Sequence, residues 1–589
     1  DNNTAVGHSS LACNTSGASN VAVGMQALFK NTTAIDNTGI GLNALCNNTT
    51  GEKNTAIGRS ALNVNSEGSL LTAVGHSALK ANTTGSNSTA VGMQALFKNT
   101  TGASNVAVGL NALCNNATGA SNTAVGSCAL KVNTASNNTA VGISALTANT
   151  TGGANTALGR QSLKANTSAA NNVAVGNNSL AANTTGANNT ALGAESLDTN
   201  TEGANNTAVG YIALGANTTG TNGVAVGCGA LKSNTEGGCN VAVGRISLQD
   251  NTTGANNVAI GASALQSNTT ASDNVAIGKS ALTATLTGCR NVAIGSNALI
   301  ANTANNNVAV GFCALRTNSS GADNTAMGRL ALTLNTTGSC NVAVGQNSLH
   351  TNTEGSCNTS IGRQALYNNT TADHNTSVGY NALFTNTTGH SNTAVGKEAL
   401  ILNTTGNCNV AIGVEAMDSN TTGSNNVGIG TDSLQGNTEG SNNISIGDDT
   451  MKTNSTGDFN TAVGKAALCS NTTADSNTAF GYVALLANTT GTQNTAVGAN
   501  ALDANIGADN NTAVGYNSLT LSTTGANNAS VGAFSLAANT EGSHNNAFGT
   551  AAMAKNTTGD NNVAIGCGAL CTNTTADNNT AVGFNSLKA

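Results

Sequence analysis

Apolar and polar positions follow one pattern along the whole chain, and this pattern repeats with a period of seventeen. The tripeptide Ala-Val-Gly, or a close variant, recurs 35 times, with its glycine at 7, 24 and 41 and onward to 583. The period shortens to sixteen in two intervals only, from Gly126 to Gly142 and from Gly295 to Gly311. A repeat that continues along the whole chain with only these two shortenings predicts one continuous repeat array over residues 1–589, with no separate domains.

The consensus of the repeat is Asn-Thr/Val-Ala-Val/Ile-Gly-x-x-Ala/Ser-Leu-x-x-Asn-Thr-Thr-Gly-x-x. Seventeen residues are too few for a repeat of the leucine-rich type, which combines a strand with a helix in about 20–29 residues. They suit one coil of a narrow solenoid with two short strands, one ending at the repeat glycine and one carrying the Ala-Leu pair. The sequence therefore predicts an all-β fold, a parallel β-solenoid of 35 coils with one seventeen-residue repeat in each coil.

Stacked coils place the same residue of each repeat in a column, with members about 4.8 Å apart. The residue before the glycine is always apolar, and the residue four after it is Leu, or Met in three copies. Because strand side chains alternate between two faces, we expect the Val and Ile positions to point inward and the small residue between them, such as Ala22, to point outward. The predicted core ladder includes Val23, Leu28, Ile40, Leu45, Ile57 and Leu62.

The outward position two before the glycine is Ala, Gly or Ser in all 35 copies. Open solvent does not require a small residue, whereas a second surface packed against that face does. We therefore expect lateral packing between identical chains. The alternative is a twisted or flattened coil that buries Ala within its own chain.

The Asn-Thr-Thr-Gly segment has the residues of a turn, since Asn and Thr form local hydrogen bonds and Gly accepts positive φ. Stacked turns predict an Asn ladder that includes Asn31, Asn48, Asn65 and Asn82. The same segments read as Asn-x-Thr sequons, so glycosylation in a eukaryotic secretory route is a second interpretation. The candidate acceptors are Asn31, Asn82, Asn99, Asn217 and Asn488.

Composition excludes several classes of function. Only 8% of residues are charged and 2% aromatic, Pro and Trp are absent, and the net charge is −7 with 20 Lys and Arg. These cations are too few and too scattered for a nucleic-acid surface, and no stretch approaches the roughly 20 apolar residues of a membrane span. Residue 1 is Asp, and no signal peptide precedes it, which predicts a processed product or an internal piece of a longer protein.

Catalysis needs unlike residues that converge in one pocket, and the repeat spreads its few His and acidic residues over variable positions of separate coils. We therefore expect no enzyme activity, no cofactor and no metal. The 14 Cys lie at different places in the coil and show no zinc spacing. Cys340 and Cys357 share a turn position in adjacent coils, so they are the candidate pair for a disulfide.

Three segments carry a resemblance to a known family: Asn20-Val-Ala-Val-Gly24, Asn257-Val-Ala-Ile-Gly261 and Asn291-Val-Ala-Ile-Gly295. They resemble the Asn-Ser-Val-Ala-Ile-Gly motif in the head repeats of trimeric autotransporter adhesins. The whole consensus is similar to the Asn-Thr-Ala-Val-Gly repeats of bacterial and viral fibre proteins. The resemblance covers essentially the whole chain, and it implies a left-handed β-roll and a homotrimer.

These observations predict a non-enzymatic fibre of an extracellular appendage, an adhesin shaft or a virion fibre. Its location would be extracellular, on a cell surface or on a virion, and its partner would be further copies of itself, packed laterally or end to end. End-to-end stacking is expected because both ends show the regular repeat without a polar cap. The alternatives are an adhesin head that binds a host receptor or glycan, and an ice-binding solenoid with Thr rows.

Overall fold

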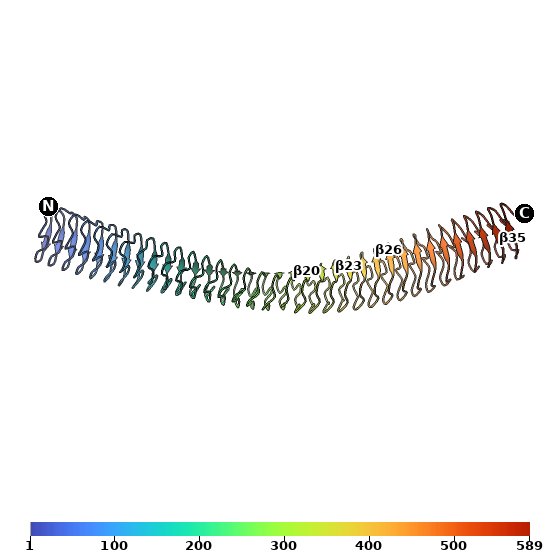
Figure 1. Ribbon diagram of the computed structural model, residues 1–589, viewed down its shortest axis with the longest axis horizontal. Helices are drawn as coiled ribbons and strands as arrows, with labels where there is room; N and C mark the ends of the chain where they lie inside the picture. The colour runs from blue at the N-terminus through green and yellow to red at the C-terminus, as the bar shows by residue number, and fades with distance from the viewer. Residues whose placement is uncertain (1, 589) are drawn as a thin grey trace. The chain divides into compact units, whose positions relative to one another are not determined.

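The computed structural model describes residues 2–588, and it forms two compact units, residues 1–291 and 292–589. Each unit by itself is a stack of near-identical coils, drawn from blue to green for the first and on to red for the second (Figure 1). The described residues contain β-strands and turns but no helix. The predicted all-β parallel solenoid, with one repeat of the sequence in each coil, is therefore confirmed.

Each coil contributes one strand of three residues. The strands of the first unit are β1 (Thr4–Val6), β2 (Val21–Val23), β3 (Thr38–Ile40), β4 (Thr55–Ile57), β5 (Thr72–Val74), β6 (Thr89–Val91), β7 (Val106–Val108), β8 (Thr123–Val125), β9 (Thr139–Val141), β10 (Thr156–Leu158), β11 (Val173–Val175), β12 (Thr190–Leu192), β13 (Thr207–Val209), β14 (Val224–Val226), β15 (Val241–Val243), β16 (Val258–Ile260) and β17 (Val275–Ile277). The strands of the second unit are β18 (Val292–Ile294), β19 (Val308–Val310), β20 (Thr325–Met327), β21 (Val342–Val344), β22 (Thr359–Ile361), β23 (Thr376–Val378), β24 (Thr393–Val395), β25 (Val410–Ile412), β26 (Val427–Ile429), β27 (Ile444–Ile446), β28 (Thr461–Val463), β29 (Thr478–Phe480), β30 (Thr495–Val497), β31 (Thr512–Val514), β32 (Ala529–Val531), β33 (Asn546–Phe548), β34 (Val563–Ile565) and β35 (Thr580–Val582).

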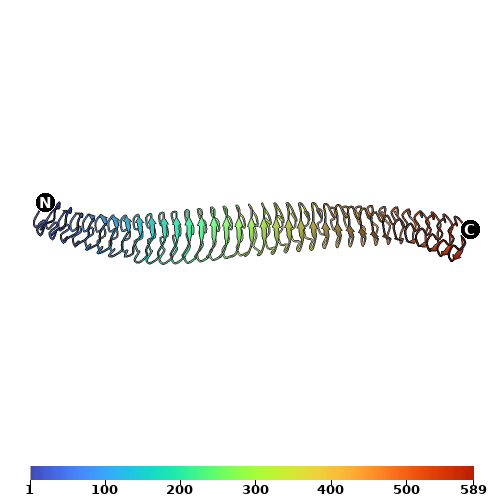
Figure 2. The same cartoon turned by 90° about the horizontal axis from the view of Figure 1, so that it is seen from above.

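Within each unit, neighbouring strands pair in parallel and in register, so that equivalent residues of successive coils lie side by side (Figure 2). In β2 and β3, for example, Val23 pairs with Ile40. The expected second strand is wrong, because the Ala-Leu pair lies in a turn in which Leu28 has φ +49°. The left-handed region is unfavourable for a residue with a Cβ, by about 1–2 kcal/mol, so burial of the leucine has to offset this strain in every coil.

The repeat glycine ends each strand at a sharp corner. Gly24 has φ +126°, and a Cβ at this position would lie 2.7 Å from the carbonyl oxygen of Gly41 in the next coil. An L-residue is therefore excluded both by its backbone conformation and by the adjacent coil. This accounts for a glycine at the same place in all copies.

The inward residue of each strand is the small one, and not the Val or Ile expected there. Ala22 and Leu28 are completely buried, whereas Val23 is only half-buried. Ile40 and Ile57 expose 38% and 39% of their surface. The alternation of side chains was correctly predicted, but its direction was wrong for Val23, Ile40 and Ile57.

The leucines of the predicted core ladder do lie inside, since Leu28, Leu45 and Leu62 have no exposed surface. The leucine lies against the inner face of the strand: a Cβ added to Gly39 of β3 would lie 3.3 Å from Cγ of Leu28. Only a side chain as small as Ala, Gly or Ser then fits on the inner face of the strand. The small residue in all 35 copies thus follows from packing within one chain, which was the alternative interpretation of this position.

The Asn-Thr-Thr-Gly segment contributes a buried column of asparagines. The Asn48 side-chain amide donates to Oδ1 of Asn31 at 3.0 Å, and the amides of Asn65 and Asn82 continue the chain at 2.7 Å each. Each amide also donates within its own coil, as Asn48 does to the carbonyl of Gly51 at 2.8 Å. These four asparagines have no exposed surface, so the Asn ladder belongs to the interior.

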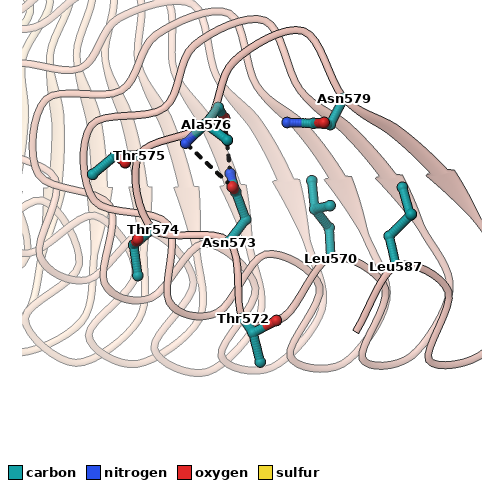
Figure 3. Close-up of a pocket in the computed structure, with 8 residues that line it drawn as sticks. All are labelled: Leu570, Thr572, Asn573, Thr574, Thr575, Ala576, Asn579 and Leu587. Atoms are coloured by element: carbon teal, nitrogen blue, oxygen red, sulfur yellow. Dashed lines mark hydrogen bonds between the residues drawn. The ribbon is translucent and has the colours of Figure 1, made fainter. Parts of the chain in front are cut away.

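Figure 3 shows this arrangement in the last coils described. Asn573 donates its amide to the carbonyl of Ala576 at 3.0 Å and accepts from the Ala576 N–H at 3.2 Å. Leu570 and Leu587, equivalent residues of successive coils, lie beside it. Leu587 is exposed at this end, whereas within the stack both columns are completely buried, as at Leu45 and Asn48.

A second asparagine column was not predicted. Asn37, the residue before strand β3, donates its backbone N–H to Oδ1 of Asn20 at 2.9 Å and its amide to the carbonyl of Gly51 at 2.9 Å. Both asparagines are completely buried. The signal in the sequence was the Asn that precedes most Thr/Val-Ala-Val/Ile-Gly segments, and its role became visible only once the inside of the coil was known.

The two shortened repeats lose their residue in the turn. Asn133 donates its amide to the carbonyl of Ala135, two residues on, and Asn302 does the same to Ala304. In regular coils the acceptor lies three residues on. Strand pairing is unchanged, with Thr123 opposite Thr139, so the turn absorbs the deletion.

Candidate functional site

The first outward surface of each coil is the outer side of the strand, which we call the strand face. It consists of the residues three and one before the repeat glycine, mostly Thr or Val and then Val or Ile. Ile361, Ile412 and Ile446 expose 40%, 39% and 36% of their surface. Because every coil contributes the same kind of pair, the strand face is an apolar band with Thr hydroxyls that runs along each unit.

The second outward surface follows the repeat glycine, and we call it the variable face. It consists of the residues one, two, five and six after the glycine, which differ from coil to coil. Contacts between coils show that these positions are neighbours: Lys397 pairs with Glu415 at 3.3 Å, and Lys452 pairs with Asp432 at 2.9 Å. The variable face therefore forms a continuous surface of side chains that are far apart in the sequence.

One part of the variable face, across the coils of β19 to β23, combines aromatic and cationic side chains. The rings of His350, Tyr367 and Phe384 stack on one another, with centroids 4.9 and 5.2 Å apart. The Arg363 guanidinium lies over the Tyr380 ring, 5.7 Å from its centroid. This cluster was not predicted, because its members belong to successive coils and are separated by a full repeat in the sequence.

Burial lowers the pKa of His350 below its ordinary value of 6.5, which favours the neutral imidazole. Its Nδ1 is buried without a hydrogen-bond partner, and so are the Oδ1 atoms of Asn347 and Asn381 in the same part of the face. Buried polar atoms normally have partners. Oδ1 of Asn43, at the same position of a coil in the first unit, is unpaired as well, so the unpaired asparagine oxygens are a property of this coil position, whereas the stacked His350 is found only here among the described residues.

The next coils, those of β24 to β27, are rich in acidic residues. Their carboxylates are partly neutralised by lysines. Lys452 lies 2.8 Å from Asp449. The carboxylates of Asp449 and Asp432 together hold the pKa of this lysine well above its usual range. Burial raises the pKa of Asp418. Because these ion pairs are partly exposed, each one stabilises the fold only slightly.

The five candidate glycan acceptors all lie inside the folded chain. Asn31, Asn82, Asn99, Asn217 and Asn488 have no exposed surface, and each donates its amide within the buried asparagine column. A glycan on this nitrogen would remove a donor and would not fit between stacked coils. The Asn-x-Thr spacing here serves the interior of the solenoid.

Cys340 and Cys357 lie side by side on the outside of the turn, and both are free thiols in the structure. Partial burial raises the pKa of the Cys340 thiol, and the neighbouring Cys357 sulfur raises it further. The sequence correctly predicted that these two cysteines are neighbours, and the disulfide between them stays a prediction.

Other features give no site. Among residues 2–588 there is no group of three or more His, Cys, Asp or Glu side chains arranged to hold a metal ion. The same residues contain no helix with the length and apolar character needed to cross a membrane. A shallow hollow on the variable face of the first unit, between Lys164 and Asp198, is lined mainly by small residues.

Comparison with known proteins adds no identification. No protein-family model matches the chain, and no curated protein is significantly similar to it. Function has to be inferred from the two outward faces.

Proposed function

We propose that this chain is a non-enzymatic segment of a structural fibre, in which identical copies pack side by side through their strand faces. The observation that carries the proposal is the apolar band of Val, Ile, Leu and Phe side chains along each unit, many of them exposed by more than a third. Contiguous apolar surfaces beyond a few hundred Å² are rare on isolated soluble proteins and mark interaction surfaces.

The periodicity of the band favours a second copy of the chain as its partner. Rows that repeat once per coil, about every 4.8 Å, can be matched along their whole length only by a surface with the same repeat. A second copy of the chain has the same repeat, because it has the same sequence. Burial of the apolar rows against each other would stabilise the assembly by about 25 cal/mol for each Å² removed from water.

Lateral packing was expected from the sequence, but for a different reason. The small residues that suggested it are inside the coil, and the Val and Ile residues expected inside form the outer surface instead. The resemblance to trimeric autotransporter adhesin heads supports three copies and an extracellular, cell-surface or virion location.

The test replaces strand-face residues and measures the mass of the assembly. In the variant Ile361→Lys/Ile412→Lys, two charges enter the proposed interface, and we expect light scattering to show smaller species. The control Leu402→Lys/Val414→Lys changes residues that are equally exposed, at 47% and 44%, but lie on the variable face. A wild-type chain that is monomeric at high concentration, or a control that dissociates equally, contradicts the proposal.

Ice binding is a second candidate, because the strand face places Thr beside Val or Ile in a regular array. Thr38, Thr55, Thr72 and Thr89 form an unbroken row over four coils. However, a flat crystal surface requires side chains of even height, and Phe480 and Phe548 expose 53% and 42% on the same face. Side chains of a second copy can accommodate such bulges. Thermal hysteresis by the isolated chain, abolished by Thr55→Lys/Thr72→Lys, would favour ice instead.

A further inference from the structure

The variable face of the second unit contains a segment that differs from the rest of the molecule. Across the coils of β19 to β23 it presents three arginines and no carboxylate, whereas the following coils carry most of the acidic residues of this face. We define the basic–aromatic strip by the residues Phe312, Arg316, Arg329, His350, Arg363, Tyr367, Tyr380 and Phe384.

We propose that the basic–aromatic strip binds a linear polysaccharide that carries carboxylates. Arg329 and Arg363 both directly follow a repeat glycine, two coils apart, which places them about 10 Å from each other along one row. Among the described residues, neither arginine forms a salt bridge with a carboxylate of the chain. Guanidinium groups bind carboxylates through paired, charge-assisted hydrogen bonds.

Aromatic residues lie at both ends of this arginine row. Phe312 and Tyr380 expose 50% and 40% of their surface, and Arg363 is held over the Tyr380 ring. Exposed rings provide flat apolar area at little entropic expense. The apolar C–H face of a sugar ring can pack against such a surface while its polar groups reach the neighbouring arginines.

The unpaired polar atoms of the strip fit a ligand that donates hydrogen bonds in addition to carrying negative charge. Asn347 Oδ1, His350 Nδ1 and Asn381 Oδ1 have no donor in the structure, while their side chains are partly exposed. Each atom would have to be brought to the surface by rotation of its half-buried side chain. A polysaccharide acid then supplies both hydroxyl donors for these atoms and carboxylates for the arginines.

The shape of the strip selects a chain-like ligand. Its groups follow one another from coil to coil along the outer surface, and Phe312 and Tyr380 are exposed by 50% and 40%. Small molecules are normally bound in concave pockets. An extended polymer gains affinity by contacting several coils at once.

Isothermal titration with polygalacturonate tests the proposal, with its fully methyl-esterified form as the neutral counterpart. The variant Arg329→Gln/Arg363→Gln should bind polygalacturonate at least tenfold more weakly, since each lost charge-assisted bond is worth roughly tenfold or more. The matched control Arg59→Gln/Arg160→Gln removes the same charge from the same position of two coils in the first unit. The control should bind like the wild type.

Four results would overturn the proposal. They are no binding of polygalacturonate, equal binding of the methyl ester, equal loss of affinity in the control, and equally tight binding of polyglutamate or single-stranded DNA. A change in assembly mass in the Arg329→Gln/Arg363→Gln variant would reassign the strip as a contact between chains. The fibre proposal does not depend on this outcome, because its own test concerns the strand face.

Discussion

The interior columns and the variable face belong to the same coils, yet they accept very different sequences. The interior position seven after the glycine is Asn in all copies but two, whereas the position one after the glycine holds residues as different as Met25, Arg59 and Tyr380. In both places a residue lies directly above and below its equivalents. The difference is that an interior side chain has to bond or pack with a copy of itself on both sides, while an outer side chain can turn toward water.

The two exceptions in the asparagine column show how strict the interior is. Where Ser522 replaces Asn, Oδ1 of Asn505 in the preceding coil is left without a partner. Oδ1 of Asn268 is likewise unpaired beside the coil in which Thr285 stands in place of Asn. A single replacement in the interior therefore changes a neighbouring coil, and the variable face is where this chain can carry individual binding sites.

The largest expected effect contrasts two leucines of one coil. Leu332 is completely buried, and Leu334 exposes 40% on the variable face. Leu332→Asp places an uncompensated charge in the interior and should destabilise the fold by about 3–5 kcal/mol, with hydrogen exchange accelerated in adjacent coils. Leu334→Asp should change stability by less than about 0.5 kcal/mol. Equal losses in urea unfolding would show that the assigned inside and outside are wrong.

Mild oxidation should distinguish two neighbouring cysteines of the outer turns from cysteines that lie alone at the same position. Cys340 and Cys357 are adjacent free thiols, and a disulfide between them would close a loop of one repeat, for which chain entropy predicts stabilisation of about 3 kcal/mol. A mild oxidant should therefore remove this pair of thiols, as mass spectrometry of the linked peptides would show. Cys239 and Cys408 occupy the same position of their coils without a cysteine in either neighbouring turn, and they should stay reduced. Persistence of both Cys340 and Cys357 as thiols would contradict the predicted pairing.

Repair of the interior should be possible at one of its defects. Ser522→Asn supplies an amide that can donate to Asn505 Oδ1 and an oxygen that can accept from Asn539, as in regular coils. Because a buried unpaired acceptor is unfavourable by about 1–3 kcal/mol, we expect the urea midpoint to rise. Ser522→Ala, which fills no gap in the column, should not raise it. A stabilised Ala variant together with an unchanged Asn variant would mean that the asparagine column contributes little.

The sequence was sufficient for the period, the parallel solenoid and the columns of Leu28 and Asn31, because a short repeat with 35 copies contains its own comparison. It was not sufficient to predict which side chains of the strand point into the coil. A three-residue strand such as Val21–Val23 has either one residue inward and two outward or the reverse, and hydrophobicity alone favoured the wrong choice. The deciding factor was the space left beside Leu28, which is a property of the closed coil and not of the strand.

The same limit explains the errors at candidate sites. Asn31 and its equivalents look like turn residues and glycan acceptors until the turn is seen to fold its amides inward. The basic–aromatic strip was missed because residues such as His350, Tyr367 and Phe384 are unremarkable in sequence and meet only through stacking. The signal in the sequence is that these three residues occupy the same position of successive repeats, five after the glycine.

The smallest expected effect concerns the pH response of the stacked rings. Burial holds the pKa of His350 below 6.5 in the folded chain, so as pH falls through about 6.5 the unfolded chain takes up a proton before the folded chain does. The stability that the neutral imidazole contributes is thus complete above that pH and declines below it.

His350→Phe keeps an aromatic ring beside Tyr367 but cannot be protonated. The difference in urea midpoint between variant and wild type should therefore grow in favour of the variant from pH 8 to pH 5, by an amount smaller than the other effects. His374→Phe is the control, since that histidine lies in a turn outside the stack. A difference that is constant with pH would show that His350 is not held neutral by its neighbours and that the stack is as open to water as the rest of the variable face.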